Sequence, residues 1–386
     1  MRKHTNRRIP RTVALVLAAT AVAVTAAARG LASPAVRPLD SREPAPTRAA
    51  APPNASGVAA AVPTTTAQFV SMSASAAGPV NDPTFDLCAT TGTVTLPGGV
   101  QVPIWGFALK GSAADCSDVA GHATLPGPVL GAGTSPSNLD IHEGDVVHLN
   151  VTNALPAGHT ISIEAPGIGF DAGPTDAAVG ATVQRSFTAT APGTYLYQSV
   201  GDGERQTAMG LYGALIVRSN TSGHAYDDPA SDPNRSAYDV EAPLVLSAID
   251  PGFNSDPDGF DLHAYNATYW LINGKAYPQT DPIHASPNQR VLLRYVNAGY
   301  DNTTMALLGM HEHVIARDAQ LLLNPFDADA ETIPAGETED AVATVPAGSS
   351  GLPNGFPLYN RQLHLGNGSP ADPASPGGMM TFIQSP

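Results

Sequence analysis

Hydrophobic and polar residues alternate along several short segments of the chain. In residues 145–153, DVVHLNVTN, the apolar Val147, Leu149 and Val151 alternate with the polar His148 and Asn150. Residues 182–190 and 290–299 show a similar alternation. A period of two places successive side chains on opposite faces of a β-strand. No segment after residue 80 sustains a helical period over three turns, so the pattern predicts an all-β protein built from sandwiches.

The predicted strands recur in the same order in two halves of the chain. IHEGDVVHLNVTNAL, at 141–155, is echoed 144 residues later by ASPNQRVLLRYVNAG. AVGATVQRSFTATAPGTY is echoed by PAGETEDAVATVPAG, and GLYGALIV by GGMMTFI. Three echoes in one order indicate an internal repeat. We therefore predict two tandem β-sandwich domains, at 81–220 and 238–386, joined by a linker at 221–237.

The first 80 residues carry no strand pattern. Residues 1–32 contain a basic start followed by the apolar run TVALVLAATAVAVTAAA, which is typical of a signal peptide. An uncleaved anchor is the alternative, but a bilayer span needs about 20 apolar residues. Residues 33–80 are rich in Ala, Pro and Thr and predict a disordered spacer. The order predicts a secreted or cell-surface protein, exported by the general secretory or the twin-arginine route, with no transmembrane segment after the signal peptide.

The acidic charge narrows the classes of partner. Residues 1–32 hold six of the 19 basic residues and none of the 34 acidic ones, so the remainder has 13 against 34, a net charge of −21. Such a surface repels phosphate backbones and argues against a nucleic-acid partner. In an exported chain, the two cysteines, Cys88 and Cys116, predict a disulfide. A thiolate metal ligand or nucleophile is the less favoured alternative.

Several sequence motifs occur in the same order as in one family of enzymes. In the first predicted domain these are LPGPVL, IHEGDVVHLNVTNALP, APGTYLYQS and AMGLYGALIV; in the second they are YWLINGKAYP, RVLLRYVNAG, HVIARD and IPAGETEDAV. Together they resemble the multicopper oxidases. The resemblance implies that both domains are cupredoxin-like Greek-key β-sandwiches. It also implies copper as the cofactor, and, by analogy with two-domain members, a homotrimer.

The resemblance further implies where the copper ligands should lie. Two His-x-His pairs of the first domain, which in the family bind a three-copper cluster, correspond to Glu164 with Pro166 and Gln198 with Val200. Imidazole suits copper, whereas proline and valine cannot ligate a metal ion. The resemblance therefore predicts that these four positions are degenerate.

The electron-entry site of the family, a type 1 copper, requires one cysteine thiolate and two histidines. The corresponding positions in the second domain hold Ala306 and Leu308, and His364 lies near the cysteine position. Of the remaining residues of the family's type 1 copper motif, this chain keeps Gly378 and Met379. Both cysteines lie in the first domain, so the second has no thiolate to offer.

Three other groups are candidates for chemistry. His311 and His313, on one face of a predicted strand, could bind a metal ion together with His364; two hydrogen-bonded imidazoles at a strand end are the alternative. The acidic segment 250–261 could hold Ca²⁺, but a loop of Asp-Pro turns fits it better. The loop around Glu204, Arg205 and Gln206 could bind an anion, or its charges could form a surface ion pair.

Two hypotheses on function follow. The first is a secreted multicopper-oxidase-like protein without the type 1 and trinuclear ligand sets, which acts as a binding or scaffold module and is not an enzyme. The alternative is a copper-binding protein or a laccase-like oxidoreductase with a rearranged site around His311, His313 and His364. The sequence identifies no substrate or partner for either one.

Overall fold

The computed structural model describes residues 81–132, 139–173, 175–202, 204–349, 355–369 and 371–385. The predicted signal peptide and spacer lie outside these residues. Among these described residues, all regular structure is β apart from short helical turns. The two α-helices, α1 (Arg205–Met209) and α2 (Pro251–Ser255), have five residues each. Within the described ranges, no helix has the length and apolar character that crossing a membrane requires.

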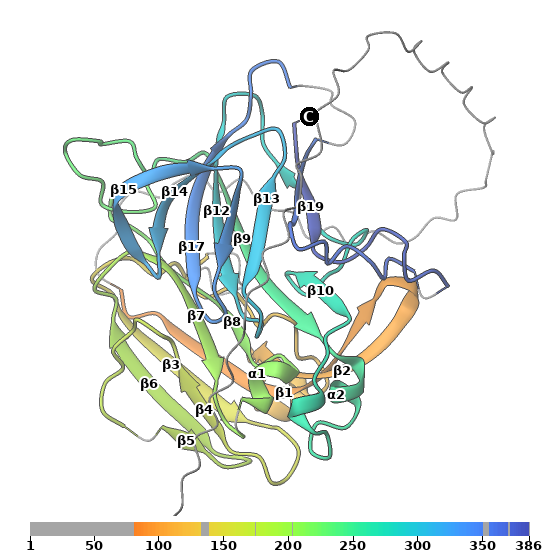
Figure 1. The fold of residues 1–386 in the computed structure, drawn as a ribbon. Coiled ribbons are helices and arrows are strands. Elements are labelled where there is room, and N and C mark those ends of the chain that lie inside the picture. Colours follow the sequence, from red (N-terminus) through yellow and green to blue (C-terminus); the bar gives the residue numbers. More distant parts are fainter. Residues whose placement is uncertain are drawn as a thin grey trace, which may run out of the picture. The chain divides into compact units, whose positions relative to one another are not determined.

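The strands between residues 84 and 217 form two four-stranded sheets, which we call the N-terminal sandwich (Figure 1). The first sheet has the order β2-β1-β3-β6, with β1 (Thr84–Leu96), β2 (Val100–Leu109), β3 (Val146–Asn153) and β6 (Thr182–Thr188). The second has the order β5-β4-β7-β8, with β4 (Ile161–Glu164), β5 (Asp176–Ala177), β7 (Gly193–Ser199) and β8 (Tyr212–Val217).

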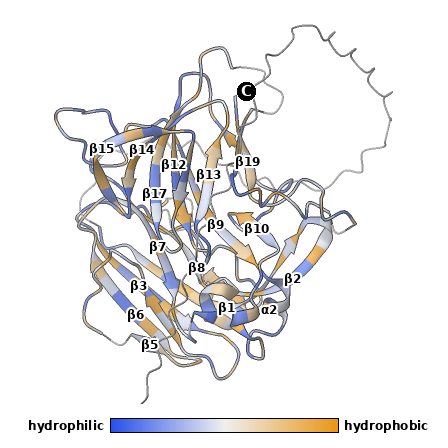
Figure 2. Ribbon diagram, viewed as in Figure 1, coloured by the Kyte–Doolittle hydropathy of each residue, from blue (hydrophilic) through white to orange (hydrophobic). Residues whose placement is uncertain are grey.

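Strand β3 illustrates how the sequence pattern builds this sandwich. Its Val147, Leu149 and Val151 are at most 1% exposed, whereas the residues between them are partly exposed. The predicted alternation is therefore confirmed, and the same banding of hydrophobic and hydrophilic residues is visible along β3 and β6 in Figure 2. Burial of this apolar face provides the main driving force for closing the sandwich.

The strands between residues 240 and 384 form a six-stranded and a five-stranded sheet, which we call the C-terminal sandwich (Figure 1). The larger sheet has the order β10-β9-β12-β17-β14-β15, with β9 (Val240–Ile249), β10 (Tyr269–Ile272), β12 (Arg290–Asn297), β14 (Glu312–Arg317), β15 (Gln320–Ala328) and β17 (Thr338–Thr344). The smaller has the order β11-β19-β18-β13-β16, with β11 (Ile283–His284), β13 (Thr303–Leu307), β16 (Ala330–Ile333), β18 (Phe356–Asn360) and β19 (Met380–Gln384).

The predicted all-β fold of two tandem sandwiches is confirmed. Each sandwich has its own sheets, and among the described residues no named strand falls between β8 and β9. The domain limits of 81–220 and 238–386 stay a prediction. Each sandwich also buries its own apolar cluster, around Phe85, Leu149 and Phe187 in the first and around Leu293, Met305 and Ile383 in the second.

A buried ionic network joins the two sandwiches. Arg294, on β12, has no exposed surface, and its Nε donates to Glu241 Oε1 at 2.6 Å. Its Nη1 donates to Asp340 at 3.1 Å and to the hydroxyl of Thr194, on β7 of the N-terminal sandwich, at 2.9 Å. Burial opposes the charge of Arg294, but the carboxylates of Glu241 and Asp340 hold its pKa above the usual value. The guanidinium therefore remains charged within the protein interior.

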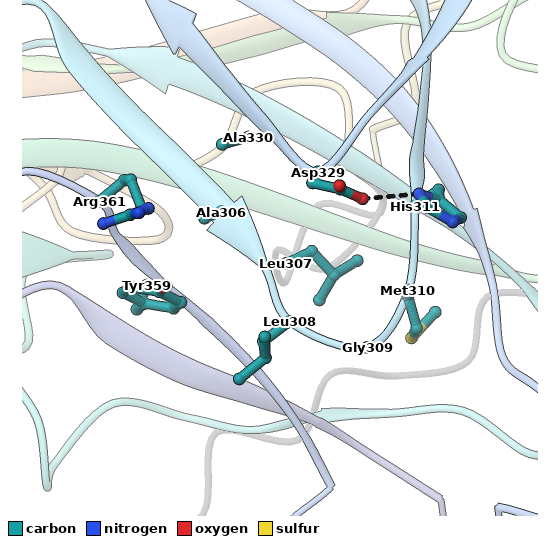
Figure 3. Close-up of a pocket in the computed structure, with 10 residues that line it drawn as sticks. All are labelled: Ala306, Leu307, Leu308, Gly309, Met310, His311, Asp329, Ala330, Tyr359 and Arg361. Atoms are coloured by element: carbon teal, nitrogen blue, oxygen red, sulfur yellow. Dashed lines mark ion pairs between the residues drawn. The ribbon is translucent and has the colours of Figure 1, made fainter. Parts of the chain in front are cut away.

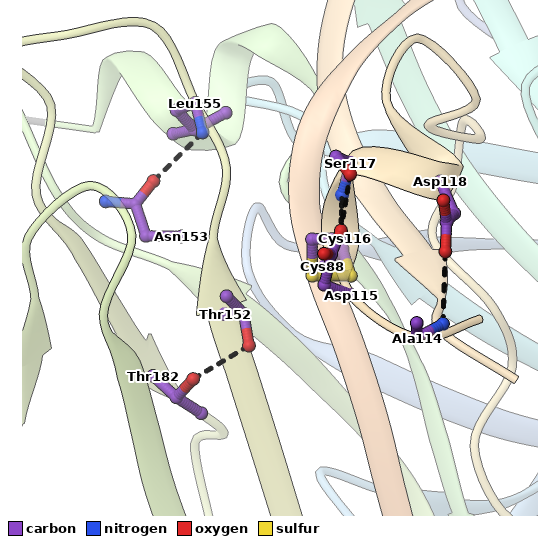
Figure 4. The surroundings of a disulfide bond; sticks show 10 residues. All are labelled: Cys88, Ala114, Asp115, Cys116, Ser117, Asp118, Thr152, Asn153, Leu155 and Thr182. Atoms are coloured by element: carbon purple, nitrogen blue, oxygen red, sulfur yellow. Dashed lines mark hydrogen bonds between the residues drawn. A yellow bond between two sulfur atoms is a disulfide. The ribbon is translucent and has the colours of Figure 1, made fainter. Parts of the chain in front are cut away.

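Cys88 and Cys116 form the predicted disulfide, with their Cα atoms 5.6 Å apart (Figure 4). It ties β1 to a 3₁₀ turn at Cys116–Val119. The turn is held locally as well, because Asp115 accepts a hydrogen bond from the Ser117 amide at 2.8 Å and caps its start. The disulfide is thus a structural crosslink in the N-terminal sandwich.

Candidate functional site

Two of the four predicted cluster positions face each other across neighbouring strands. Glu164, the last residue of β4, is the register partner of Gln198 on β7. Gln198 Nε2 donates a hydrogen bond to Glu164 Oε1 at 3.0 Å. The antiparallel pairing places two residues that are 34 positions apart in the sequence next to each other, and their side chains form a hydrogen bond.

The other two positions lie just beyond these strands. The backbone amide of Val200 donates to Ser162 O at 3.1 Å, which continues the pairing past the end of β7. Pro166 lines a cavity of about 200 Å³ at the junction of the two sandwiches, together with Tyr195 and with Thr338 from the C-terminal sandwich. Burial raises the pKa of Tyr195 to about 12, so its phenol stays neutral. This cavity has no histidine among the described residues that line it.

The prediction of a loop around Glu204, Arg205 and Gln206 is wrong in part, because Arg205 and Gln206 begin helix α1, where their side chains have a structural role. Arg205 Nη1 donates to the carbonyl oxygens of Pro257 at 2.6 Å and Phe260 at 3.1 Å, and both acceptors lie in the loop after α2. Gln206 is fully buried and accepts a hydrogen bond from the Ser199 hydroxyl at 2.7 Å. The guanidinium of Arg205 therefore ties the start of α1 to the loop after α2.

Each histidine of the predicted metal site has its own partner. His311 Nδ1 lies 2.6 Å from Asp329, and His313 Nδ1 lies 2.7 Å from Asp327, across the β14–β15 pair. His364 instead stacks on Trp270, with ring centroids 4.1 Å apart and an interplanar angle of 13°. Burial lowers the pKa of His364. In the part of the chain that the structure describes, no three His, Cys, Asp or Glu side chains are arranged to hold a metal ion.

The acidic segment 250–261 forms caps and turns. Asp250 accepts hydrogen bonds from the amides of Gly252 at 2.8 Å and Phe253 at 3.3 Å, which caps α2. Asp261 accepts one from the amide of His263 at 3.0 Å. These carboxylates serve backbone donors at turns and a helix start, in line with the alternative to a Ca²⁺ site.

A pocket of about 480 Å³ opens where the resemblance places the electron-entry ligands (Figure 3). We call it the β13 pocket; it is lined by Ala306, Leu307, Leu308, Gly309, Met310, His311, Asp329, Ala330, Tyr359 and Arg361. Ala306, Leu307 and Met310 are at most 5% exposed, and Leu308 is 60% exposed. In Figure 3, Arg361 and Tyr359 lie on one side of these apolar residues and the His311–Asp329 ion pair on the other.

Sequence reasoning missed the polar rim of this pocket. Arg361 follows β18 and Asp329 precedes β16, so only the sheet brings them to either side of Leu308. It also missed the Arg294 network, although an arginine within the apolar run RVLLRYV is a signal of a buried, paired charge.

The C-terminal sandwich buries two glutamate side chains whose carboxyl groups have raised pKa values. Burial raises the pKa of Glu312, on β14, to about 7, and that of Glu339, on β17, to about 8. The Tyr295 hydroxyl donates to Glu312 at 2.6 Å, and Arg317 Nε donates to Glu339 at 2.9 Å. One oxygen of each carboxyl group has no hydrogen-bond partner among the described residues. These contacts only partly offset the loss of hydration.

Comparison with known proteins agrees with this fold. A family model described as multicopper oxidase matches residues 132–222. The chain is 24% identical over 251 residues to Laccase-25 of Oryza sativa subsp. japonica, covering 58% of this chain and 39% of the laccase. It is 25% identical over 302 residues to the multicopper oxidase MmcO of Mycobacterium tuberculosis, covering 65% of this chain and 53% of that protein. The chain thus spans about half or less of these relatives.

Solved structures show the same architecture. A blue copper oxidase from Nitrosomonas europaea superposes with a TM-score of 0.62 at 22% identity, covering 79% of this chain and 86% of the other. At this identity the likeness concerns the fold, which is that of cupredoxin sandwiches. The matched domain, the relatives and the fold agree in their similarity to the multicopper oxidase family.

Proposed function

We propose that this chain is an exported binding protein, built on the multicopper oxidase scaffold, that lacks the type 1 and trinuclear copper ligand sets. The observation that carries the proposal is the hydrogen bond from Gln198 to Glu164, at two of the positions that the resemblance assigns to cluster ligands. A hydrogen bond between these side chains satisfies them without a metal ion.

The residues at the four cluster positions do not fit a copper cluster. Pro166 and Val200 have no side-chain donor atom. Glu164 and Gln198 offer a carboxylate and an amide, which are harder ligands than the imidazole that suits copper. Ala306 and Leu308 likewise offer only carbon where the resemblance places type 1 ligands, and both disulfide sulfurs belong to the other sandwich. We therefore assign no oxidase chemistry to these positions.

The alternative is a copper-binding protein or a laccase-like oxidoreductase that uses His311, His313 and His364. The observation that favours it is that His311 and His313 pair with two aspartates two residues apart, Asp329 just after β15 and Asp327 within it. His364 contributes a stacked ring beside Trp270 and takes part in neither ion pair. A metal ion would have to displace both aspartate contacts or recruit them as ligands.

Copper loading of the full chain separates the two functions. We expect no stoichiometric Cu(II) uptake by calorimetry, no thiolate-to-copper absorption band, and no oxygen consumption with a phenolic reductant. Uptake or oxygen consumption that the His311→Ala/His313→Ala variant abolishes would establish the alternative instead. His263→Ala is the matched control, because the side chain of His263 is 97% exposed and lies away from these strands.

Residues 1–32 support the proposal of export, and placement at the cell surface or in the medium follows from it. Fractionation of the native cells, with the mature N-terminus read by mass spectrometry, tests that part. A mature chain that begins at Met1 in the cytoplasm would contradict it.

A further inference from the structure

We infer that the β13 pocket binds small monocarboxylates that carry an apolar chain, with the carboxylate on Arg361 and the chain over Leu307, Leu308 and Met310. The inference rests on the proposed function: for a binding protein that holds no copper at this position, it names the class of ligand that the pocket takes. The support for it is the charge and the polarity of the side chains that line the pocket.

The pocket has a cationic side chain, that of Arg361. The structure describes eight arginines, and seven of them direct their guanidinium groups to carboxylates, carbonyl oxygens or an aromatic ring. Arg361 alone has no side-chain hydrogen bond, ion pair or ring contact to the described residues. In a chain with 34 acidic residues against 19 basic ones, such an arginine is exceptional. A guanidinium binds a carboxylate through two parallel hydrogen bonds.

The backbone holds this cation at the pocket. The Arg361 amide donates to Thr304 O at 2.8 Å, which fixes the residue beside β13. The amide of Leu308 donates to Pro357 O at 2.9 Å, so the other end of β13 is tied to β18 as well. The backbone of Arg361 and the apolar floor therefore belong to one hydrogen-bonded unit, from which the guanidinium extends on its own side chain.

Apolar side chains form the floor of the pocket. Leu307 and Met310 are 1% and 5% exposed, and they form a floor on which Leu308, 60% exposed, stands as a rim (Figure 3). A leucine exposed to this extent beside a concave surface gains free energy when a ligand covers it. A volume of about 480 Å³ lies within the range of pockets that take small organic molecules.

The far side of the pocket limits the ligand to one carboxylate. Asp329 lies opposite Arg361 in Figure 3, and its ion pair with His311, at 2.6 Å, leaves no free cation among the described residues there. A second carboxylate at the distal end of the ligand would meet this acidic side chain and be repelled by it. The pocket should therefore discriminate between a monocarboxylate and a dicarboxylate of equal length.

Binding of octanoate to the full chain, measured by titration calorimetry or saturation-transfer NMR in chelator-treated buffer, tests the inference. We expect octanoate to bind and 1-octanol and suberate to bind at least tenfold more weakly, because one charge-assisted pair is lost or one repulsion added. No octanoate binding, or equal binding of octanol, would overturn the inference. Copper uptake in the separate loading experiment would overturn the proposed function without touching this result.

Two variants with matched controls locate the site. Arg361→Gln should weaken octanoate binding about tenfold or more, whereas Lys110→Gln, which removes one positive charge from the N-terminal sandwich, should leave it unchanged. Leu308→Ser should weaken binding severalfold, whereas Leu323→Ser, at a leucine 89% exposed on β15, should not. Both tested side chains lie at the pocket's open rim, so these variants are expected to fold. Equal effects in a variant and its control would overturn the assignment to this pocket.

Discussion

Gln198 and Glu164 are register partners on β7 and β4, and the amide of Gln198 donates to the carboxylate of Glu164 at 3.0 Å. Both side chains are partly buried. Residues that the family resemblance assigns to two separate histidine pairs thus form one cross-strand pair. Such pairs are the unit by which neighbouring strands stabilise each other, so this contact has a measurable energetic consequence.

The first prediction is that these two side chains are energetically coupled. Gln198→Leu and Glu164→Leu should each destabilise the protein, and the double variant should be less destabilised than the sum by about 1 kcal/mol. Urea unfolding of the four proteins measures this coupling. The exposed pair Gln101 and Thr95, hydrogen-bonded at 2.8 Å on the β1–β2 hairpin, is the matched control and should show a smaller coupling. Strict additivity for Gln198 and Glu164 would contradict the prediction.

The second prediction concerns the buried charge that joins the sandwiches. Arg294→Met leaves Glu241 and Asp340 in the interior without that guanidinium and should lower the free energy of unfolding by about 3–5 kcal/mol. Arg290→Met, on the same strand, should cost less than about 1 kcal/mol, since Arg290 contacts backbone carbonyls at the surface. Chemical denaturation measures both values.

If Arg294→Met does not fold, the double variant Arg294→Met/Asp340→Leu keeps the prediction testable. Removing Asp340 together with its partner takes one uncompensated charge out of the interior and should recover part of the lost stability. A double variant less stable than Arg294→Met would show that packing and the hydrogen bonds that Asp340 accepts from Thr194 and Tyr226, and not its charge, dominate at this junction.

The third prediction is a pH dependence that originates in Glu312 and Glu339. Burial raises the pKa of Glu312 from 4.5 in the unfolded chain to about 7 in the fold, and that of Glu339 to about 8. Between these values the folded state keeps a proton that the unfolded state has lost. The contribution of the two groups to stability is therefore present at low pH, falls as the pH rises from about 4.5, and levels off above about 8.

Glu312→Gln isolates this effect. The variant keeps an oxygen acceptor for Tyr295 but cannot ionise, so its stability relative to the wild type should rise by about 2–3 kcal/mol between pH 5 and pH 8. Thermal unfolding at both pH values measures the difference. Glu337→Gln, in the turn before β17, is the control and should show no comparable change. A Glu312→Gln variant that tracks the wild type at both pH values would refute the assignment.

The fourth prediction is that the disulfide stabilises the N-terminal sandwich. Cys88 and Cys116 are 28 residues apart, and a crosslink that closes a loop of this size removes chain entropy from the unfolded state worth about 3–4 kcal/mol. Cys88→Ala/Cys116→Ala should lose this amount in urea unfolding, and a reducing agent should destabilise the wild type but not the variant. Equal sensitivity of both proteins to the reductant would contradict the prediction.

The sequence alone determined the strands, the order of the two halves and the disulfide. Alternation in segments such as DVVHLNVTN needs only local information, because each residue's face follows from its neighbours. The order of the motifs along the chain likewise shows that Glu164, Pro166, Gln198 and Val200 occupy the expected ligand positions.

Which of these residues come into contact depends on how the strands pair and the sheets pack. The contact between Glu164 and Gln198 depends on the pairing of β4 with β7, and the Arg294 network depends on the packing of two sandwiches. The β13 pocket joins Arg361, Leu308 and Asp329, which lie on three different connections of one sandwich. Contacts between distant segments arise from strand register and sheet packing, and no local pattern records either of them.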